Sequence, residues 1–197
     1  CRRVGIKVAG YFTESPYDTN ADSELNLARW VDVAFTNERT VVPDFERVMA
    51  GRPHIAEYLG HSYDPRFHRP PFRGEITPDD AGADVMLVGT GFLERQRLLE
   101  SIDWTGIDLA LGGIWPEMTE DHPLARFIRY PCIRNDRMAA YYHRAKIALN
   151  PHRAYDVGRP PQSMGPRAYE IAACQTFQIV DRRPEVEQIL GDSVAIY

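Results

Sequence analysis

The stretch ADVMLVGTGFLERQRLLESI, residues 83–102, contains the signals of a strand, a turn and a helix in succession. Its first nine residues form a short apolar run that ends in glycines, which is typical of a buried strand followed by a tight turn. The segment 92–102 then repeats apolar residues at helical spacing. The side chains expected to share its broad face are Phe92, Leu93, Leu98, Leu99 and Ile102. This succession predicts an α/β unit built on a parallel sheet.

The same alternation continues towards both ends of the chain. After residue 102 we expect strands at 107–113, 127–130, 146–152, 176–181 and 193–197, and helices at 136–145, 164–175 and 184–190. Before residue 83 we expect strands at 4–12, 31–37 and 54–62, and helices at 23–31 and 38–51, the latter broken near Pro43. Asn135 or Asp136 is expected to cap the helix at 136–145, and Pro166 lies near the first turn of the helix at 164–175. Strands that alternate with helices in this way predict two α/β units.

The segment 64–82 has a different composition. It contains four prolines and two glycines, and its apolar residues show no regular period, which is typical of a linker. We therefore predict one unit at 1–63, a proline-rich linker at 64–82 and a second unit at 83–197. Because the chain begins at Cys1 and enters its first strand at once, we expect a fragment of a longer protein with an incomplete first unit.

Composition and charge restrict the class of protein. The 197 residues include 23 basic and 28 acidic side chains, and the net charge of −5 argues against nucleic-acid binding over the whole surface. The chain has no apolar run of about 18 residues, so a membrane span is not expected. Its three cysteines (Cys1, Cys132 and Cys174) are widely spaced, which predicts reduced thiols in a cytoplasmic protein.

Basic residues gather in one part of this acidic chain. Between residues 123 and 170 there are nine arginines and lysines but only three acidic residues. Arginine is suited to bidentate recognition of phosphate, and the helix expected to open with SMGPR (163–167) adds exposed N–H groups that favour an anion. The turn at 88–91 is a second place where backbone can approach a phosphate, with Arg95 close by in sequence. An ordinary solvated surface is the alternative interpretation.

Three polar side chains near expected strand or helix ends are further candidates. Glu170 lies about one turn into its helix, where a carboxylate could accept the hydroxyls of a ribose or form an ion pair with Arg167, three residues earlier. His152 follows Asn150 at a strand end and could donate to a sugar or phosphate oxygen, or simply be exposed. Glu14 follows the first strand and could line a cleft or cap a loop.

The stretch KIALNPHR…SMGPRAYEIAACQTFQIVDRRPEVEQIL resembles the CgeB-like (spore-coat maturation type) glycosyltransferases, which are related to the retaining family 4 enzymes. VMLVGTGFLERQRLLESI resembles the first strand, loop and helix of that family's C-terminal domain. YFTESPYDT, VDVAFTNE and YLGHSYDPRFHRP resemble the end of its N-terminal domain and the linker. The resemblance implies a GT-B fold with two Rossmann-like units and parallel sheets: an acceptor-side unit at 1–63 and a nucleotide-sugar-binding unit at 83–197.

The resemblance also implies an activity: transfer of a sugar from a nucleoside diphosphate sugar to a hydroxyl acceptor, expected to be retaining and to need no metal ion or other cofactor. Arginines would neutralise the diphosphate as it leaves. The catalytic candidates are His152, Arg153 and Glu170. The substrate-binding candidates are Gly89, Thr90, Arg95, Asn150, Ser163, Met164, Arg167, Glu170 and Glu14.

Two positions depart from the family pattern. Gln162 stands where family 4 enzymes have a second glutamate, and Gln175 stands where a glycine is expected. A GT-B-like binding or structural protein without activity therefore stays open, as does another sugar-nucleotide enzyme such as an epimerase. The acceptor also stays open among a small molecule, a polysaccharide, a protein and modified DNA.

Overall fold

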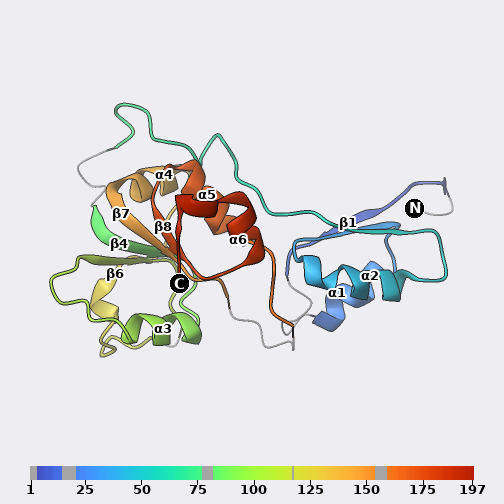
Figure 1. The fold of residues 1–197 in the computed structure, drawn as a ribbon, viewed down its shortest axis with the longest axis horizontal. Helices are drawn as coiled ribbons and strands as arrows, with labels where there is room; N and C mark the ends of the chain where they lie inside the picture. The colour runs from blue at the N-terminus through green and yellow to red at the C-terminus, as the bar shows by residue number, and fades with distance from the viewer. Residues whose placement is uncertain (1–3, 15–20, 77–81, 117, 154–158) are drawn as a thin grey trace. The chain divides into compact units, whose positions relative to one another are not determined.

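The structure is a computed structural model of the chain, and it describes residues 4–14, 21–76, 82–116, 118–153 and 159–197. The described residues form two compact units, each built around a parallel sheet (Figure 1). The first unit is formed by residues within 1–61, 155–164 and 183–186, and the second by residues within 62–154, 165–182 and 187–197. The α/β class with two parallel sheets, expected from the sequence, is confirmed. Residues 77–81 of the expected linker lie outside the described ranges.

The first unit has three parallel strands in the order β1-β2-β3. They are β1 (Ala9–Phe12), β2 (Val33–Thr36) and β3 (Ile55–Tyr58), and they alternate with α1 (Ala21–Ala28), the short 3-10 helix η2 (Arg39–Val41) and α2 (Val42–Met49). Pro43 lies at the start of α2, where its missing N–H costs no hydrogen bond, so the expected break separates η2 from α2. Phe12, Phe45 and Met49 form the centre of the core.

The second unit has six parallel strands in the order β6-β5-β4-β7-β8-β9. Their bounds are β4 (Ala83–Val88), β5 (Leu109–Gly112), β6 (Ile128–Tyr130), β7 (Ala145–Asn150), β8 (Gln178–Val180) and β9 (Ala195–Ile196). Numbered along this unit, the order is 3-2-1-4-5-6, which is that of the Rossmann fold. The strand order therefore reverses between β4 and β7, where Val85 pairs with Ile147.

Helices cover both faces of the six-stranded sheet. They are α3 (Leu93–Glu100), α4 (Asn135–Arg144) and α5 (Pro166–Ala173), with the 3-10 helix η3 (Ala125–Phe127). The residues of α6 (Pro184–Ile189) are divided between the two units, and the 3-10 helix η4 (Gly191–Ser193) precedes β9. Tyr142 of α4 and Ile171 of α5 pack with Met86 on one face. Leu99 of α3 packs with Leu87 on the other face, and Figure 1 shows α3 opposite α4 and α5. Alternate residues of β4 thus serve two separate apolar layers.

Three local expectations were wrong. The first strand begins at Ala9 rather than at residue 4. Leu93 does not join the buried face of α3: it is 52% exposed, and Gln96 is buried in that helix instead because its Nε2 donates to the carbonyl of Gly91 at 2.8 Å. The residue before α4 is Arg134, and its guanidinium binds the carboxylate of Asp136, which was an expected cap.

Candidate functional site

The carboxyl ends of β4 and β7 mark the point where the strand order of the second unit reverses. In open parallel sheets, ligands bind outside the carboxyl ends of the strands at such a point. The turn at 89–92 follows β4, residues 151–153 follow β7, and Asp181 follows β8 on the next strand. These segments bring several of the candidate residues to one edge of the sheet.

Arg95, in the first turn of α3, binds two of the loops at this edge. Its Nη1 donates to the carbonyl oxygen of Thr90 at 2.8 Å, and its Nε and Nη2 donate to the carbonyl oxygen of Pro151 at 3.2 and 2.8 Å. A methyl group added to Gly89 would lie 2.8 Å from the same guanidinium, so the Gly89 backbone passes directly beside it. Burial lowers the pKa of Arg95, yet arginine stays charged in proteins. The site thus contains a half-buried cation held by backbone carbonyls.

Other arginines lie close to Arg95. The guanidinium of Arg153 lies over the ring of Phe92, 4.4 Å from its centroid, and that of Arg95 lies 5.5 Å from the same centroid. Arg167 is near enough to Arg95 for its charge to lower the pKa of Arg95 further. Like charges gathered at one place raise the local concentration of anions. The structure therefore brings together three cations that the sequence placed far apart.

His152, directly after β7, is held by Asp181 after β8. The Oδ1 atom of Asp181 lies 2.6 Å from the backbone nitrogen of His152 and 2.7 Å from its Nδ1. Because the carboxylate accepts the Nδ1 proton, a neutral ring has its lone pair at Nε2. Nε2 is buried and has no hydrogen-bond partner among the described residues. A methyl group on Gly165 would lie 3.2 Å from the ring, so the imidazole faces the residue that precedes α5.

Glu170 and Arg167 form an ion pair on α5, with 3.0 Å between Oε2 and Nη1. The Arg167 guanidinium also contacts α4: Tyr142 interacts with it and, together with Glu170, raises the pKa of Arg167. The other carboxylate oxygen of Glu170, Oε1, lies 3.8 Å from Nε2 of His68. The ion pair that the sequence allowed is therefore present, and a histidine that the sequence did not single out faces the same carboxylate.

A comparison with models of protein families shows to which family the chain belongs. Residues 95–197 match a family model described as glycosyl transferase-like, and the match covers more than half of the chain. The chain belongs to the glycosyl transferase-like family. No curated protein matched the sequence. Membership supports a GT-B-type glycosyltransferase, in which a donor and an acceptor of a sugar meet.

In this glycosyl transferase-like chain, the side chain of Asn150 forms a hydrogen bond in the protein interior. It ends β7 and is only 5% exposed. Its Nδ2 donates to Oε1 of Gln178 at 3.1 Å, and Nε2 of Gln178 donates to the carbonyl oxygen of Ala168 at 3.0 Å. This chain of hydrogen bonds links β7, β8 and α5. The Asn150 amide therefore fixes the strand end that precedes His152, and it is occupied within the protein.

Ser163 and Met164 lie in the first unit, where two buried carboxylates bind their backbone. The amides of Gln162 and Ser163 each donate to the Glu38 carboxylate at 3.1 Å. The amide of Met164 donates to the Glu185 carboxylate at 2.6 Å. Three consecutive N–H groups of the segment that precedes α5 are thus satisfied by protein carboxylates. Neither contact could be predicted from the sequence, because neither glutamate is near this segment in the chain.

Glu14 is exposed in the first unit, after β1. Its backbone amide donates to Oε1 of Glu24 in α1 at 3.1 Å. Burial raises the pKa of Glu24 to about 7. This hydrogen bond fastens the backbone of Glu14 to α1, and the role of the Glu14 side chain stays a prediction.

Not all of the basic residues at 123–170 lie at the sheet edge that carries Arg95. Arg129 pairs with Asp108, and Lys146 pairs with Asp84 at 2.6 Å. Both aspartates lie at or just before the starts of strands, at the opposite edge of the sheet. The count of basic residues along the sequence therefore overstates the positive charge near the carboxyl ends of β4 and β7.

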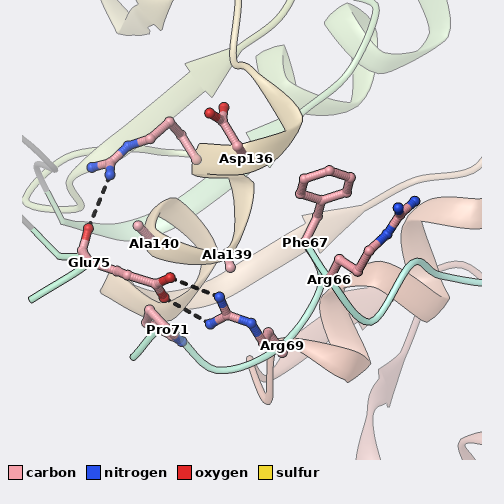
Figure 2. A pocket seen from close by; sticks show the side chains of 9 residues that line it. Arg66, Phe67, Arg69, Pro71, Glu75, Asp136, Ala139 and Ala140 are labelled. Atoms are coloured by element: carbon pink, nitrogen blue, oxygen red, sulfur yellow. Dashed lines mark hydrogen bonds and ion pairs between the residues drawn. The ribbon is translucent and has the colours of Figure 1, made fainter. Parts of the chain in front are cut away.

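A small cavity of about 150 Å³ lies between the segment 66–75 and α4 (Figure 2). Its lining residues are Arg66, Phe67, Arg69, Pro71, Glu75, Asp136, Arg137, Ala139 and Ala140. Arg69 binds the Glu75 carboxylate through two hydrogen bonds of 2.8 Å, and Arg137 of α4 donates to the Glu75 carbonyl at 3.1 Å. Hydrogen bonds from charged side chains therefore hold the cavity wall together and fasten the segment 66–75 to α4.

Neither a metal cluster nor a membrane span is found in the described part of the chain. Among the described residues, no three His, Cys, Asp or Glu side chains are placed to hold a metal ion. The described helices are all too short or too polar to cross a bilayer, which requires about 20 apolar residues. The metal independence of the reaction stays a prediction.

Proposed function

We propose that the chain transfers a sugar from a nucleoside diphosphate sugar to a hydroxyl acceptor, as a CgeB-like GT-B glycosyltransferase of the cytoplasm. Family membership supports glycosyl transfer, and the 3-2-1-4-5-6 sheet supplies the type of edge at which nucleotides bind. The observation that carries the proposal is the gathering of Arg95, Arg153 and Arg167 around the carboxyl ends of β4 and β7.

These arginines would act on the diphosphate. Negative charge grows on the diphosphate as its bond to the sugar breaks, and fixed cations stabilise that charge without having to reorganise. Arg95 is already fixed by three hydrogen bonds to two loops, so it meets this requirement best. Since arginines supply the positive charge, we propose a reaction that needs no metal ion.

Glu170 and His152 would bind the rest of the donor. Glu170 Oε1 is the carboxylate oxygen that its ion pair with Arg167 leaves available, and it would accept a ribose hydroxyl. His152 is oriented by Asp181, and its buried Nε2 would contact the donor sugar or a phosphate oxygen once the segment near Gly165 adjusts. Retention of configuration is proposed from the family 4 resemblance, and the acceptor stays open.

A nucleotide-binding protein without turnover is the second candidate. Gln162 favours it, because a second carboxylate is expected at that position in family 4 enzymes. The amide of Gln162 is bound to Glu38, which places the start of the 162–164 segment in a protein contact. In this candidate the donor site would bind a nucleotide, and no sugar would be released.

The test is calorimetric titration of the chain with UDP, GDP, ADP and CDP, with magnesium and with a chelator. We expect one diphosphate to bind equally in both conditions, and Arg153→Met to weaken binding by about 1–3 kcal/mol. Arg97→Met, on the exposed side of α3, is the matched control and should bind as the unaltered chain does. Release of sugar from the matching donor would establish turnover, and binding without release would establish the second candidate. If no diphosphate binds, the proposal is wrong.

A further inference from the structure

We propose that His68 is a positioning residue for Glu170, and that through Glu170 it makes the donor site select ribose over 2′-deoxyribose. This inference rests on the proposed function, because it requires Glu170 to accept the ribose hydroxyls. His68 lies in the segment 64–75 of the second unit, far from Glu170 in sequence. Its side chain is 9% exposed and is directed at the Glu170 carboxylate.

The tautomer of His68 is set by a backbone group. The amide of Asp64 donates to Nδ1 of His68 at 3.1 Å, so Nδ1 acts as an acceptor. A neutral imidazole that accepts at Nδ1 has its proton at Nε2. The backbone amide of His68 in turn donates to the carbonyl oxygen of Asp64 at 2.8 Å. His68 therefore presents an N–H group, and not a lone pair, to its other neighbour.

That neighbour is Oε1 of Glu170, 3.8 Å from Nε2 of His68. The second oxygen, Oε2, receives a hydrogen bond of 3.0 Å from Nη1 of Arg167. The carboxylate thus lies between two donors that come from different elements. At 3.8 Å the N–H of His68 attracts Oε1 without forming a hydrogen bond, so Oε1 keeps its capacity to accept a hydroxyl. This arrangement orients the carboxylate and leaves one oxygen available.

The backbone around His68 is fastened to the rest of the second unit. Figure 2 shows Arg66, Phe67 and Arg69, the residues on either side of His68, beside α4. Arg69 is bound to Glu75, whose carbonyl oxygen accepts from Arg137 of α4. A segment without helix or strand structure would otherwise allow His68 many positions. These contacts explain how a loop residue can hold a fixed position against α5.

A fixed carboxylate matters because it must meet hydroxyl groups whose positions are set by the ribose ring. A site built to hydrogen-bond a hydroxyl group rejects an analogue that lacks it, since the polar group of the site is then left unpaired. If the Glu170 carboxylate can rotate away, this penalty disappears. Loss of His68 is therefore expected to affect the preference for ribose more than the overall affinity for the diphosphate.

The experiment compares UDP, GDP, ADP and CDP with their 2′-deoxy counterparts by calorimetry. For the nucleotide that binds, the unaltered chain is expected to prefer the ribose form by about tenfold, the effect of one hydrogen bond to a charged group. His68→Asn can still accept from Asp64 but is too short to reach Glu170, so the preference should fall to less than about threefold. His68→Gln places an amide N–H near the position of Nε2 and should restore it.

Two controls separate positioning from loss of structure. His122 has a similar arrangement elsewhere in the second unit, with a shorter separation: its Nδ1 accepts from the amide of Leu124, and its Nε2 lies 3.0 Å from Oε1 of Glu100. His122→Asn should therefore leave the ribose preference unchanged. In a Glu170→Gln background, His68→Asn should have no further effect, because residues that act through one group are not additive.

The possible results separate a failure of the His68 role from a failure of the proposed function. If no diphosphate binds the unaltered chain, the proposed function fails and the inference fails with it. If the unaltered chain prefers ribose and His68→Asn keeps that preference, only the role of His68 is refuted. If the unaltered chain binds ribose and deoxyribose forms equally, Glu170 does not read the ribose, and the inference is refuted while the diphosphate site stands.

Discussion

Replacement of Arg95 by methionine tests whether one side chain holds the two loops at the carboxyl ends of β4 and β7 together. The change removes three hydrogen bonds to the carbonyl oxygens of Thr90 and Pro151, while methionine fills most of the volume of the arginine stem. At about 1 kcal/mol net for each bond, the loss is about 3 kcal/mol. Burying a cation is itself unfavourable, and relief of that cost returns part of the loss. We expect a net destabilisation of about 2 kcal/mol.

The assay is urea unfolding followed by circular dichroism, with Arg97→Met as the control on the exposed side of the same helix. Arg97→Met should change the free energy of unfolding by less than about 0.5 kcal/mol. Calorimetry on the same two proteins should show that only the Arg95 variant loses affinity for a nucleoside diphosphate. Equal stability of the two variants would show that the Arg95 hydrogen bonds do not hold the loops, and the argument from fixed charge would then be wrong.

Three further predictions concern groups that are partly or fully buried. Asp181→Asn should destabilise the chain by about 1–3 kcal/mol and shift the His152 tautomer in nitrogen NMR spectra, because Nδ1 loses its carboxylate. Burial raises the pKa of Tyr142 to about 12, so the neutral phenol stabilises the folded chain fully below pH about 10, and this stabilisation is lost as pH rises through 12. The ultraviolet absorbance of the phenolate should increase over the same pH range as the stability falls. Burial raises the pKa of Glu24 to about 7, so its stabilising effect is present below pH about 4.5 and is lost as pH rises through 7. Glu24→Gln should abolish that loss and stabilise the chain above pH 7 by about 1 kcal/mol, allowing for solvent screening of a half-buried group.

Most of the fold could be predicted because its signals are local. Apolar runs that end in glycine and are followed by helical spacing occur within windows of about 20 residues, and each such window specifies one strand-helix unit. The limits of the elements were less predictable. Leu93 has the spacing of a core residue, yet α3 begins there and the polar Gln96 is buried in its place through a bond to Gly91. A tertiary hydrogen bond of this kind has no signature in apolar periodicity.

The candidate site was only partly predictable for the same reason. Arg95, Arg153 and Arg167 could be proposed because each lies near a strand end or a helix start. Asp181 also follows a strand, at the edge that carries His152, so its position in the sequence was a usable signal. His68 had no such signal, because its segment reads as a linker and its contact with α5 depends on long-range folding.

The two carboxylates that bind residues 162–164 have a consequence for how such chains can evolve. Glu38 comes from the first third of the chain and Glu185 from its last third, yet both bind one short segment of the first unit. A recombination event that exchanged residues 1–61 with those of another family member would replace Glu38 while keeping the amides that it binds. Such a chimaera should survive only where the incoming sequence carries an equivalent acid, so residues 1–61 and the segment 162–164 are expected to be inherited together.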